Sequence, residues 1–397
     1  MSNQFISDDV IAKTALASFM NHLSLASTAN IQYRDEFTVG RGDTIRIEKP
    51  VNFTVRSGEV ALDQDFVQRS TSITVAHQDG VDMIFSSKQR GLELRKFNEN
   101  VIEPAMKDLA NQVDYRGIQV GLEAIYHTVQ ASGKSMTFAD INRGRAFLSK
   151  VGVNPDYCLM NIDDATDLKN SLQNSFNATL NKNISERAAL GNLAGLDIYE
   201  SQNLVPHVVG VQGGTPLVNG GGQSGKSLKT SGWTPKKTVL NEGDIFYIEN
   251  VYTVNPVTGL PIGSGDSNLQ RFVVCNEVIS DETGNAVINF KNDLVLSGPY
   301  KTVSQSPDDK AKITVLGKPN STFSNNFIYS REAFSLACIR LPEPRGAGFA
   351  KTVVDNETGI AMRMIEDYDS KTDRSRIRFD VMYGWLCNPE YGVRVVV

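Results

Sequence analysis

The stretch that decides the fold covers residues 97–129 and reads FNENVIEPAMKDLANQVDYRGIQVGLEAIYHTV. Its apolar residues recur at steps of three and four, which predicts a helix with one buried face. These residues are Ile102, Met106, Leu109, Val113, Ile118, Leu122, Ile125 and Val129. Asn98 or Asn100 is placed to cap the first turn, and Pro104 fits within that turn. Gly133 lies just past the pattern and predicts the end of the helix.

The length of this helix is its second informative feature. At about 1.5 Å per residue, an unbroken helix would be roughly 45 to 50 Å long. A compact domain rarely needs such a length, so we expect a long supporting helix against which several sheets pack. The alternative is an ordinary core helix that breaks near Gly117 or Gly121.

Composition limits the class of protein. A chain of 397 residues with 40% hydrophobic and 21% charged residues is typical of a globular protein with two or three domains. The net charge of -5 and the lack of a Lys and Arg cluster argue against a dedicated nucleic-acid binder. No apolar run reaches the roughly 18 residues of a membrane helix, and no signal-peptide pattern opens the chain. We therefore expect the chain to stay in the cytoplasm.

Cysteine and histidine spacing gives no sign of a metal or redox site. The four cysteines lie far apart in apolar surroundings, without a C-x-x-C pair, and are predicted to be buried thiols. They are Cys158, Cys275, Cys338 and Cys387. The four histidines are equally scattered, so we expect no metal ion and no cofactor.

The N-terminal part of the chain combines an amphipathic helix with a β-hairpin. Residues 2–30 carry an apolar helical stripe, which packs either on its own chain or on a partner. From residue 37 to residue 85 the apolar pattern alternates instead, with period two. This pattern predicts a long two-stranded excursion, which is marginal alone and needs a surface to lie on. A strand at residues 81–85 returns the chain to the long helix.

The remaining segments alternate in type and predict an α+β fold. Helices are expected at residues 137–148 and 163–172, and strands at 157–160, 195–200, 334–339, 360–365, 376–383 and 391–397. Between them, residues 233–319 contain only strand patterns, at 243–248, 271–275, 286–290 and 311–315. Short strands at regular spacing favour a small inserted β-barrel or sandwich.

One match to a phosphate-binding loop is misleading. Residues 220–227, GGGQSGKS, fit the pattern G-x-x-x-x-G-K-S. That loop works because it joins a buried strand to a helix, and here Gly232 and Pro235 follow before a helix could form. A flexible glycine linker is the favoured interpretation. The acidic pair Asp163-Asp164 and the run at 366–369 lie at element boundaries, where capping and solvation explain them.

The order of these parts, together with short local motifs, resembles a known family. The motifs are ANQVD at residues 110–114, MNIDD at 160–164, AGLDIYES at 194–201, YGW at 383–385 and NPE at 388–390. The chain resembles the major capsid (coat) proteins of tailed bacteriophages with the HK97-like fold. It is most similar to the P22-type coat protein family, which has an inserted β-domain.

This resemblance implies a division into six segments. They are an N-terminal arm at 1–36, an extended β-hairpin loop at 37–76, a peripheral domain with a spine helix at 77–135, a first axial part at 136–206, an inserted β-barrel at 207–325 and returning axial and peripheral strands at 326–397. The arm and hairpin would gain their burial on a neighbouring subunit.

The resemblance also implies a non-enzymatic, self-assembling function. Pentamers and hexamers of the chain would form an icosahedral shell around double-stranded DNA, first as a scaffold-templated procapsid that then expands. Scaffolding protein and portal protein are the implied partners, with a decoration protein as a further candidate. The shell would be the virion capsid, assembled in the cytoplasm of a host bacterium.

Three basic residues of the hairpin are the candidate contact residues. Arg46, Lys49 and Arg56 are expected to pair with acidic groups of an adjacent subunit. Two other functions stay open from the sequence. One is an encapsulin-like cellular shell, and the other is a nucleotide-binding enzyme that uses Lys226.

Overall fold

The computed structural model describes residues 8–32, 43–49, 51, 53, 58–61, 63, 68–86, 98–172, 191–355 and 358–397. The chain falls into two units. Unit 1 comprises Met1–Glu48, Ser70–Val120 and Phe334–Leu386, and unit 2 comprises Lys49–Arg69, Gly121–Ala333 and Cys387–Val397. No helix in the described ranges has the length and apolar character needed to cross a membrane.

The long helix is present and unbroken. After a π-helical turn, η2 (Asn98–Ile102), helix α4 (Glu103–Ala124) continues through Gly117 and Gly121 with Pro104 in its first turn. A Cβ atom on Gly117 would lie 2.7 Å from the Trp385 ring, so the glycine permits close packing rather than a break. The alternative of a broken core helix is therefore wrong.

The predicted C-terminal end of this helix is also wrong. Helix α4 stops at Ala124, well before Gly133, and strand β4 (Thr128–Gln130) follows. Strand β4 pairs in parallel with β23 (Gly392–Val396), and Thr128 lies opposite Arg394. Because the apolar residues after Ala124 fit either period, the sequence alone did not reveal that a distant strand pairs with them.

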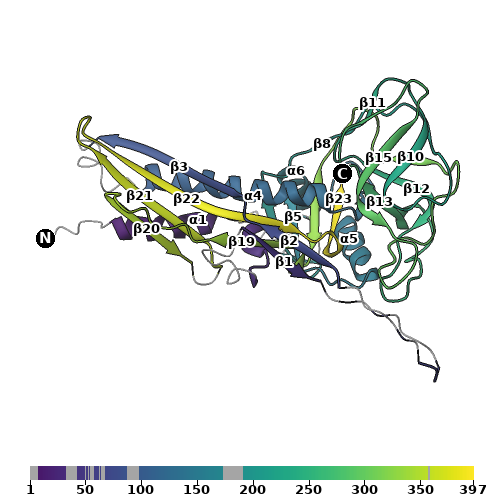
Figure 1. Ribbon diagram of the computed structural model, residues 1–397, viewed down its shortest axis with the longest axis horizontal. Helices are drawn as coiled ribbons and strands as arrows, with labels where there is room; N and C mark the ends of the chain where they lie inside the picture. Colours follow the sequence, from purple (N-terminus) through teal and green to yellow (C-terminus); the bar gives the residue numbers. More distant parts are fainter. Residues whose placement is uncertain are drawn as a thin grey trace. The chain divides into compact units, whose positions relative to one another are not determined.

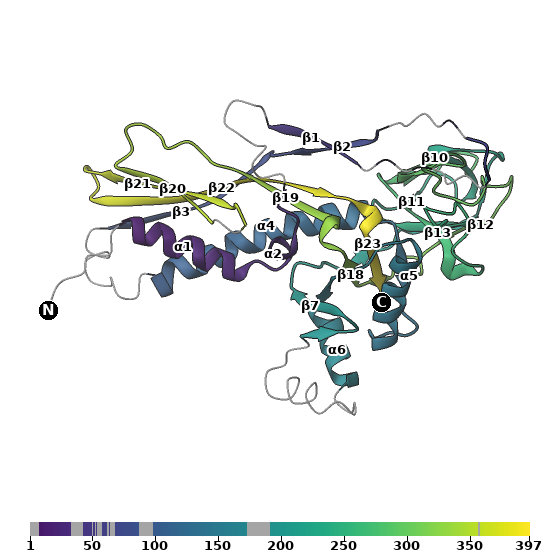
Figure 2. The ribbon, with the colours of Figure 1, turned by 90° about the horizontal axis from the view of Figure 1, so that it is seen from below.

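Unit 1 is built on one sheet covered by helices on one face (Figures 1 and 2). Its strand order is β19-β22-β21-β20, and β3 also pairs with β22. The strands are β3 (His77–Ser86), β19 (Phe334–Ile339), β20 (Phe349–Val354), β21 (Ala361–Asp369) and β22 (Arg374–Cys387). The predicted alternation in β22 is confirmed, because Ile377, Phe379, Val381 and Tyr383 are all buried. Helices α1 and α4 lie along the same face of the sheet (Figure 2).

The N-terminal arm packs on its own chain. Helix α1 (Asp8–His22) buries the predicted stripe, and the short helix α2 (Leu25–Thr28) follows it. The buried carboxylate of Asp114 on α4 accepts hydrogen bonds from the backbone N–H groups of Leu25 and Ala26 and from Ser24. These contacts tie the arm to α4 within unit 1.

The base of the hairpin is also buried within unit 1. Strands β1 (Thr44–Glu48) and β2 (Ser70–Thr74) are antiparallel, with Ile45 opposite Ile73. Ile47 and Ile73 form a cluster with Ala337 of β19. For helices α1 and α2 and strands β1 and β2, the expectation of burial on a neighbouring subunit is therefore wrong. Their apolar faces find partners in distant parts of the same chain.

Unit 2 contains a second sheet, of strand order β4-β23-β18-β5-β7-β6. Its other strands are β5 (Tyr157–Asn161), β6 (Asn192–Leu193), β7 (Leu196–Ser201) and β18 (Asn325–Tyr329). Helices α5 (Phe138–Lys150) and α6 (Ile162–Leu172) pack on it, and Thr137 and Asp140 form a capping box at the start of α5. Both helices and the strands β5, β7 and β23 agree with the sequence prediction, whereas β4, β6 and β18 were not predicted.

The segment between His207 and Phe323 is made of strands. They are β8 (His207–Val208), β9 (Gly214–Val218), β10 (Gly225–Trp233), β11 (Thr238–Leu240), β12 (Ile245–Tyr252), β13 (Leu269–Val273), β14 (Val278–Ile279), β15 (Ala286–Leu294), β16 (Ile313–Val315) and β17 (Thr322–Phe323). Short helical turns are η3 (Asp266–Asn268) here, and η4 (Arg331–Ala333) and η5 (Pro389–Tyr391) elsewhere. Strands β8 and β17 pair with each other, so the two ends of the segment meet.

Six of these strands are linked in a closed order, which we name the six-strand ring. Ladders join β9, β10 and β15, and others join β13, β12 and β16. Bridges from Val274 to Phe290 and from Leu217 to Lys312 connect the two sets. The aromatic rings of Phe246, Phe272 and Phe290 pack together in its core, with centroids 5.0 to 5.9 Å apart. The predicted flexible glycine linker at 220–227 is wrong, because these residues form the turn between β9 and β10 and the first residues of β10.

A buried arginine joins the end of α4 to the sheet of unit 2. The guanidinium of Arg394 donates to the carbonyl oxygen of Leu122 at 3.0 Å and to Asn325 Oδ1 at 2.7 Å. Burial lowers the pKa of Arg394 to about 10. Leu122 lies in the last turn of α4, where carbonyl groups lack helical donors and the helix dipole favours a cation.

We predict that Asn325→Ala destabilises the protein more than Arg394→Met. Asn325→Ala leaves the buried Arg394 cation with fewer hydrogen-bond acceptors and should lower the free energy of unfolding by about 3 to 5 kcal/mol. Arg394→Met removes the charge and leaves only neutral acceptors unpaired, which should lower the free energy of unfolding by about 1 to 3 kcal/mol. Urea unfolding of both full-length variants measures the difference. A larger loss for Arg394→Met would show that the charge itself stabilises this site.

Candidate functional site

The three predicted contact residues have different surroundings. Arg46 on β1 is exposed and donates its Nε–H to Ser70 Oγ at 2.6 Å. Lys49 already has an acidic neighbour in its own chain, with its Nζ 3.6 Å from Glu390 Oε1. Arg56 lies outside the described residues. Their pairing with another subunit stays a prediction.

The glycine-rich sequence at 220–227 is part of a β-hairpin. It contains the turn between β9 and β10, so the strand-to-helix context of a phosphate-binding loop is absent. The backbone N–H of Gly220 donates to Asp309 Oδ1 at 2.9 Å, and that of Gly222 donates to the carbonyl oxygen of Pro307 at 3.1 Å. These donors are therefore engaged within the protein. Lys226 lies 3.9 Å from Asp293, an acidic group rather than a phosphate site.

The two carboxylate clusters serve local structure. Asp164 is buried and accepts hydrogen bonds from Ser324 Oγ and, at 2.7 Å, from Asn326 Nδ2. Asp369 accepts the backbone N–H of Lys371 at 2.9 Å in the turn after β21, and this bond lowers the pKa of Asp369. Neither cluster gathers the groups of a catalytic centre. The turn contact of Asp369 fits the prediction of capping, whereas Asp164 binds side chains of a segment that is distant in the sequence.

The thiols fit the prediction of buried cysteines in three of four positions. Cys158, Cys338 and Cys387 are buried, and Cys275 is partly exposed. Burial raises the pKa of the Cys158 and Cys338 thiols to about 12, so these groups stay protonated. Over the ranges that the structure describes, no group of His, Cys, Asp and Glu side chains is arranged to hold a metal ion.

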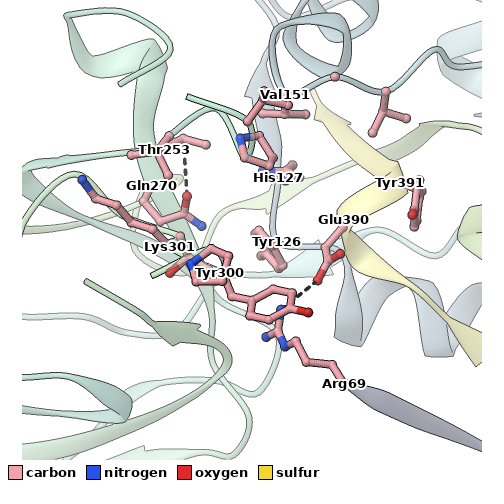
Figure 3. Close-up of a pocket in the computed structure, with 17 residues that line it drawn as sticks. Arg69, Tyr126, His127, Val151, Thr253, Gln270, Tyr300, Lys301, Glu390 and Tyr391 are labelled. Atoms are coloured by element: carbon pink, nitrogen blue, oxygen red, sulfur yellow. Dashed lines mark hydrogen bonds and ion pairs between the residues drawn. The ribbon is translucent and has the colours of Figure 1, made fainter. Parts of the chain in front are cut away.

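A cavity of about 290 Å³ in unit 2 was not predicted from the sequence (Figure 3). It is bordered by residues from the loop end at Arg69, the segment after α4, the end of α5, the six-strand ring segment and η5. Figure 3 shows Thr253, Gln270 and Lys301 on one side, Glu390 and Tyr391 on the other, and His127 and Tyr126 between them. We name it the Arg69 cavity.

The inner wall of the Arg69 cavity is polar but uncharged. Gln270 and Thr253 are almost fully buried, and Thr253 Oγ1 donates to Gln270 Oε1 at 2.9 Å. The His127 ring is also buried, with its centroid 4.4 Å from that of Tyr126 and 5.2 Å from that of Phe147. Burial lowers the pKa of His127 to about 3, so its imidazole is neutral at physiological pH.

The rim of the cavity carries the charges. The Arg69 guanidinium lies over the Tyr300 ring, 4.5 Å from its centroid. Glu390 Oε1 lies 4.0 Å from Arg69 Nη1 and also approaches Lys49. Lys301 Nζ donates to the carbonyl oxygen of Gly259 at 3.1 Å. The scattered sequence positions of these residues gave no signal, because only the fold brings them together.

We predict that His127 makes the protein less stable in acid. The unfolded state takes up a proton near the ordinary pKa of 6.5, whereas the folded state resists protonation down to about 3. Unfolding therefore binds a proton in this window, and stability falls as pH falls below 6.5. Relative to His127→Gln, the native protein should lose about 2 kcal/mol between pH 7 and pH 5.

Urea unfolding of both proteins across that pH range tests this prediction. The variant has no titrating side chain at position 127, so acid effects from all other groups cancel in the comparison. Parallel pH profiles for the two proteins would mean that His127 is accessible to protons in the folded state.

Comparison with known proteins gives the family. The family described as "P22 coat protein - gene protein 5" matches residues 2–396, which is nearly the whole chain. The chain therefore belongs to the P22 coat protein family. Membership makes it a phage major capsid protein and a component of the virion shell, as the sequence motifs indicated. Such a family is a structural one.

Several solved structures are similar to the chain at low sequence identity. One, from Mycobacterium phage Che8, is 12% identical, with 94% of this chain and 90% of that chain covered and a TM-score of 0.44. The capsid of Helicobacter pylori bacteriophage KHP30 is 10% identical, with 90% and 86% covered and a TM-score of 0.40. A virus-like particle from Pyrococcus furiosus is 8% identical, with 98% of both chains covered and a TM-score of 0.41. No curated protein sequence matches the chain.

Proposed function

We propose that the chain assembles with copies of itself, as pentamers and hexamers, into an icosahedral HK97-like shell that encloses the double-stranded DNA of a tailed phage. Scaffolding protein directs the first shell, a procapsid that later expands, and portal protein occupies one vertex. Assembly takes place in the host cytoplasm. The family match over residues 2–396 carries this proposal, because it spans both units.

Surface chemistry supports repeated contacts between copies. Phe53 and Val60, on the segment between β1 and β2, are 62% and 86% exposed in the single chain. Exposed apolar residues gain free energy when an interface covers them. The net charge of -5 also suits a container for DNA, because an acidic chain would not bind the phosphates tightly.

The six segments expected from the sequence serve as the proposed domains. The inserted domain at 207–325 is supported by the six-strand ring and by the pairing of β8 with β17, which brings its two ends together. We propose that this segment is a β-barrel added to the shell-forming fold. The arm, the hairpin loop and the axial and peripheral parts keep the boundaries given above.

Electron microscopy of the protein expressed alone, with sedimentation of the same sample, tests the proposed function. Closed shells, or shells mixed with spirals and tubes, are expected because a capsid protein carries its own lattice contacts. If only monomers appear, scaffolding protein from the same phage is added. The absence of particles in both samples would contradict the proposal.

We predict that the triple variant Arg46→Glu, Lys49→Glu and Arg56→Glu forms no shells but remains a folded, soluble chain. The reason is that acidic groups of the adjacent subunit would then face acidic groups. Because Lys49 is also close to Glu390 in its own chain, Glu390→Gln is the matched control. It removes that internal pair without changing the charge of the hairpin.

Shell yield by electron microscopy and folding by circular dichroism are measured together. The control should assemble normally while the triple variant does not. Normal shells from the triple variant would show that these three residues do not form the contact.

A further inference from the structure

A buried arginine on β13 lacks most of its hydrogen-bond partners. Arg271 is 8% exposed, and its Nε and Nη1 atoms have no acceptor among the described residues. Its Nη2 atom donates to the carbonyl oxygen of Asp266 at 2.9 Å. Successive side chains of a strand point to opposite faces, so Arg271 lies away from the Arg69 cavity, which its neighbour Gln270 lines. One neutral acceptor therefore serves the whole buried guanidinium.

The charge of Arg271 is not compensated either. No carboxylate of the described residues forms an ion pair with this side chain, and Asp266 offers it only a backbone oxygen. Burial lowers the pKa of Arg271, and the weaker electrostatic influence of Tyr247 and Asp266 does not cancel this effect. A guanidinium nonetheless stays protonated at physiological pH. Within the described ranges, the protein thus encloses a cation without an anionic partner.

An aromatic ring covers the face of this guanidinium but not its edge. The centroid of the Tyr247 ring, on the paired strand β12, lies 4.0 Å from the guanidinium carbon of Arg271. Such a cation–π contact involves the face of the planar group. The N–H groups lie in the plane and point outward along the edge. The Tyr247 contact therefore does not replace an acceptor at Nε and Nη1.

The other deeply buried arginine of unit 2 shows what a satisfied site looks like. Arg394 donates from Nε and Nη2 to Asn325 Oδ1 and from Nη1 to the carbonyl oxygen of Leu122. All three of its nitrogen atoms thus have acceptors within the chain. The fold does not provide the same for Arg271. A buried polar group left unsatisfied in a native protein indicates a bound water molecule or ion.

The missing partner of Arg271 has to supply both an acceptor and a negative charge. A water molecule would accept a hydrogen bond but leave the buried charge uncompensated, which is costly. A divalent anion would replace the buried positive charge with a negative one. We propose that Arg271 binds a small monovalent inorganic anion of about the size of chloride, which accepts a hydrogen bond from an unsatisfied N–H group of the guanidinium. The anion has to be small because Nε and Nη1 are almost inaccessible to solvent.

Urea unfolding of the full-length protein in sodium chloride or sodium gluconate tests the proposal. Gluconate is too large for an enclosed position, so it is the matched salt at equal ionic strength. With a dissociation constant of about 10 mM, about 200 mM chloride should lower the unfolding equilibrium constant about 20-fold relative to gluconate. An unfolding constant that is no lower in chloride than in gluconate would overturn the proposal.

Variants locate the site. Arg271→Met and Arg271→Gln remove the buried charge, so both should lose the chloride effect. Lys318→Met removes a positive charge from an exposed residue and should keep it. An equal chloride effect in the Arg271 variants and the native protein would mean that the ion binds elsewhere. If neither Arg271 variant folds, the chloride dependence of the native protein decides the question.

Stability in gluconate separates an anion site from a purely structural role. Without chloride, Arg271→Met should be at least as stable as the native protein, because no uncompensated buried charge remains. If Arg271 only supports the Tyr247 ring, or if its partner is a water molecule, Arg271→Met should instead lose the same stability in both salts. That outcome would contradict the proposal. Because unfolding is measured on the single chain, the result does not depend on the proposed capsid function.

Discussion

The close packing of α4 against β22 is the constraint on which unit 1 depends. A side chain at position 117 would collide with the Trp385 ring, so only glycine allows this approach. Trp385 then donates its Nε1–H to the carbonyl oxygen of Val113 at 3.0 Å, which satisfies the buried indole. The next residue of the helix, Asp114, binds the arm. Helix, sheet and arm are thus fixed by neighbouring residues of one helix.

Buried polar groups hold further elements together in both units. In unit 2, Arg394 binds the last turn of α4 and Asn325 of β18, and no carboxylate of the described residues pairs with it. In unit 1, Asp79 receives both the Arg116 guanidinium, at 2.9 and 3.0 Å, and the Tyr383 hydroxyl. Such satisfied polar contacts are costly to rearrange, so they specify one arrangement of elements inside each unit.

The sequence was a good guide wherever one period ran through a whole element. It predicted α4, α5, α6 and the alternation of β22, because each buries one continuous face. It failed after Ala124, where the apolar residues fit both the helical and the strand period. It also failed at β10, where glycine residues interrupt the strand pattern. The sequence could not show that the predicted contact residue Lys49 has a partner in Glu390, which lies 341 positions further along the chain. The Arg69 cavity was not predicted at all.

By itself, the sequence determined the element types, the absence of a phosphate-loop context around Lys226 and the resemblance to phage coat proteins. These depend on local spacing and on short motifs, which the linear order of residues contains. Only the tertiary structure decided where the apolar faces of helix α1 and of strands β1 and β2 are buried and which residues line the Arg69 cavity. Such contacts join residues that are distant in the chain, and their free energy exists only once the backbone has brought them together.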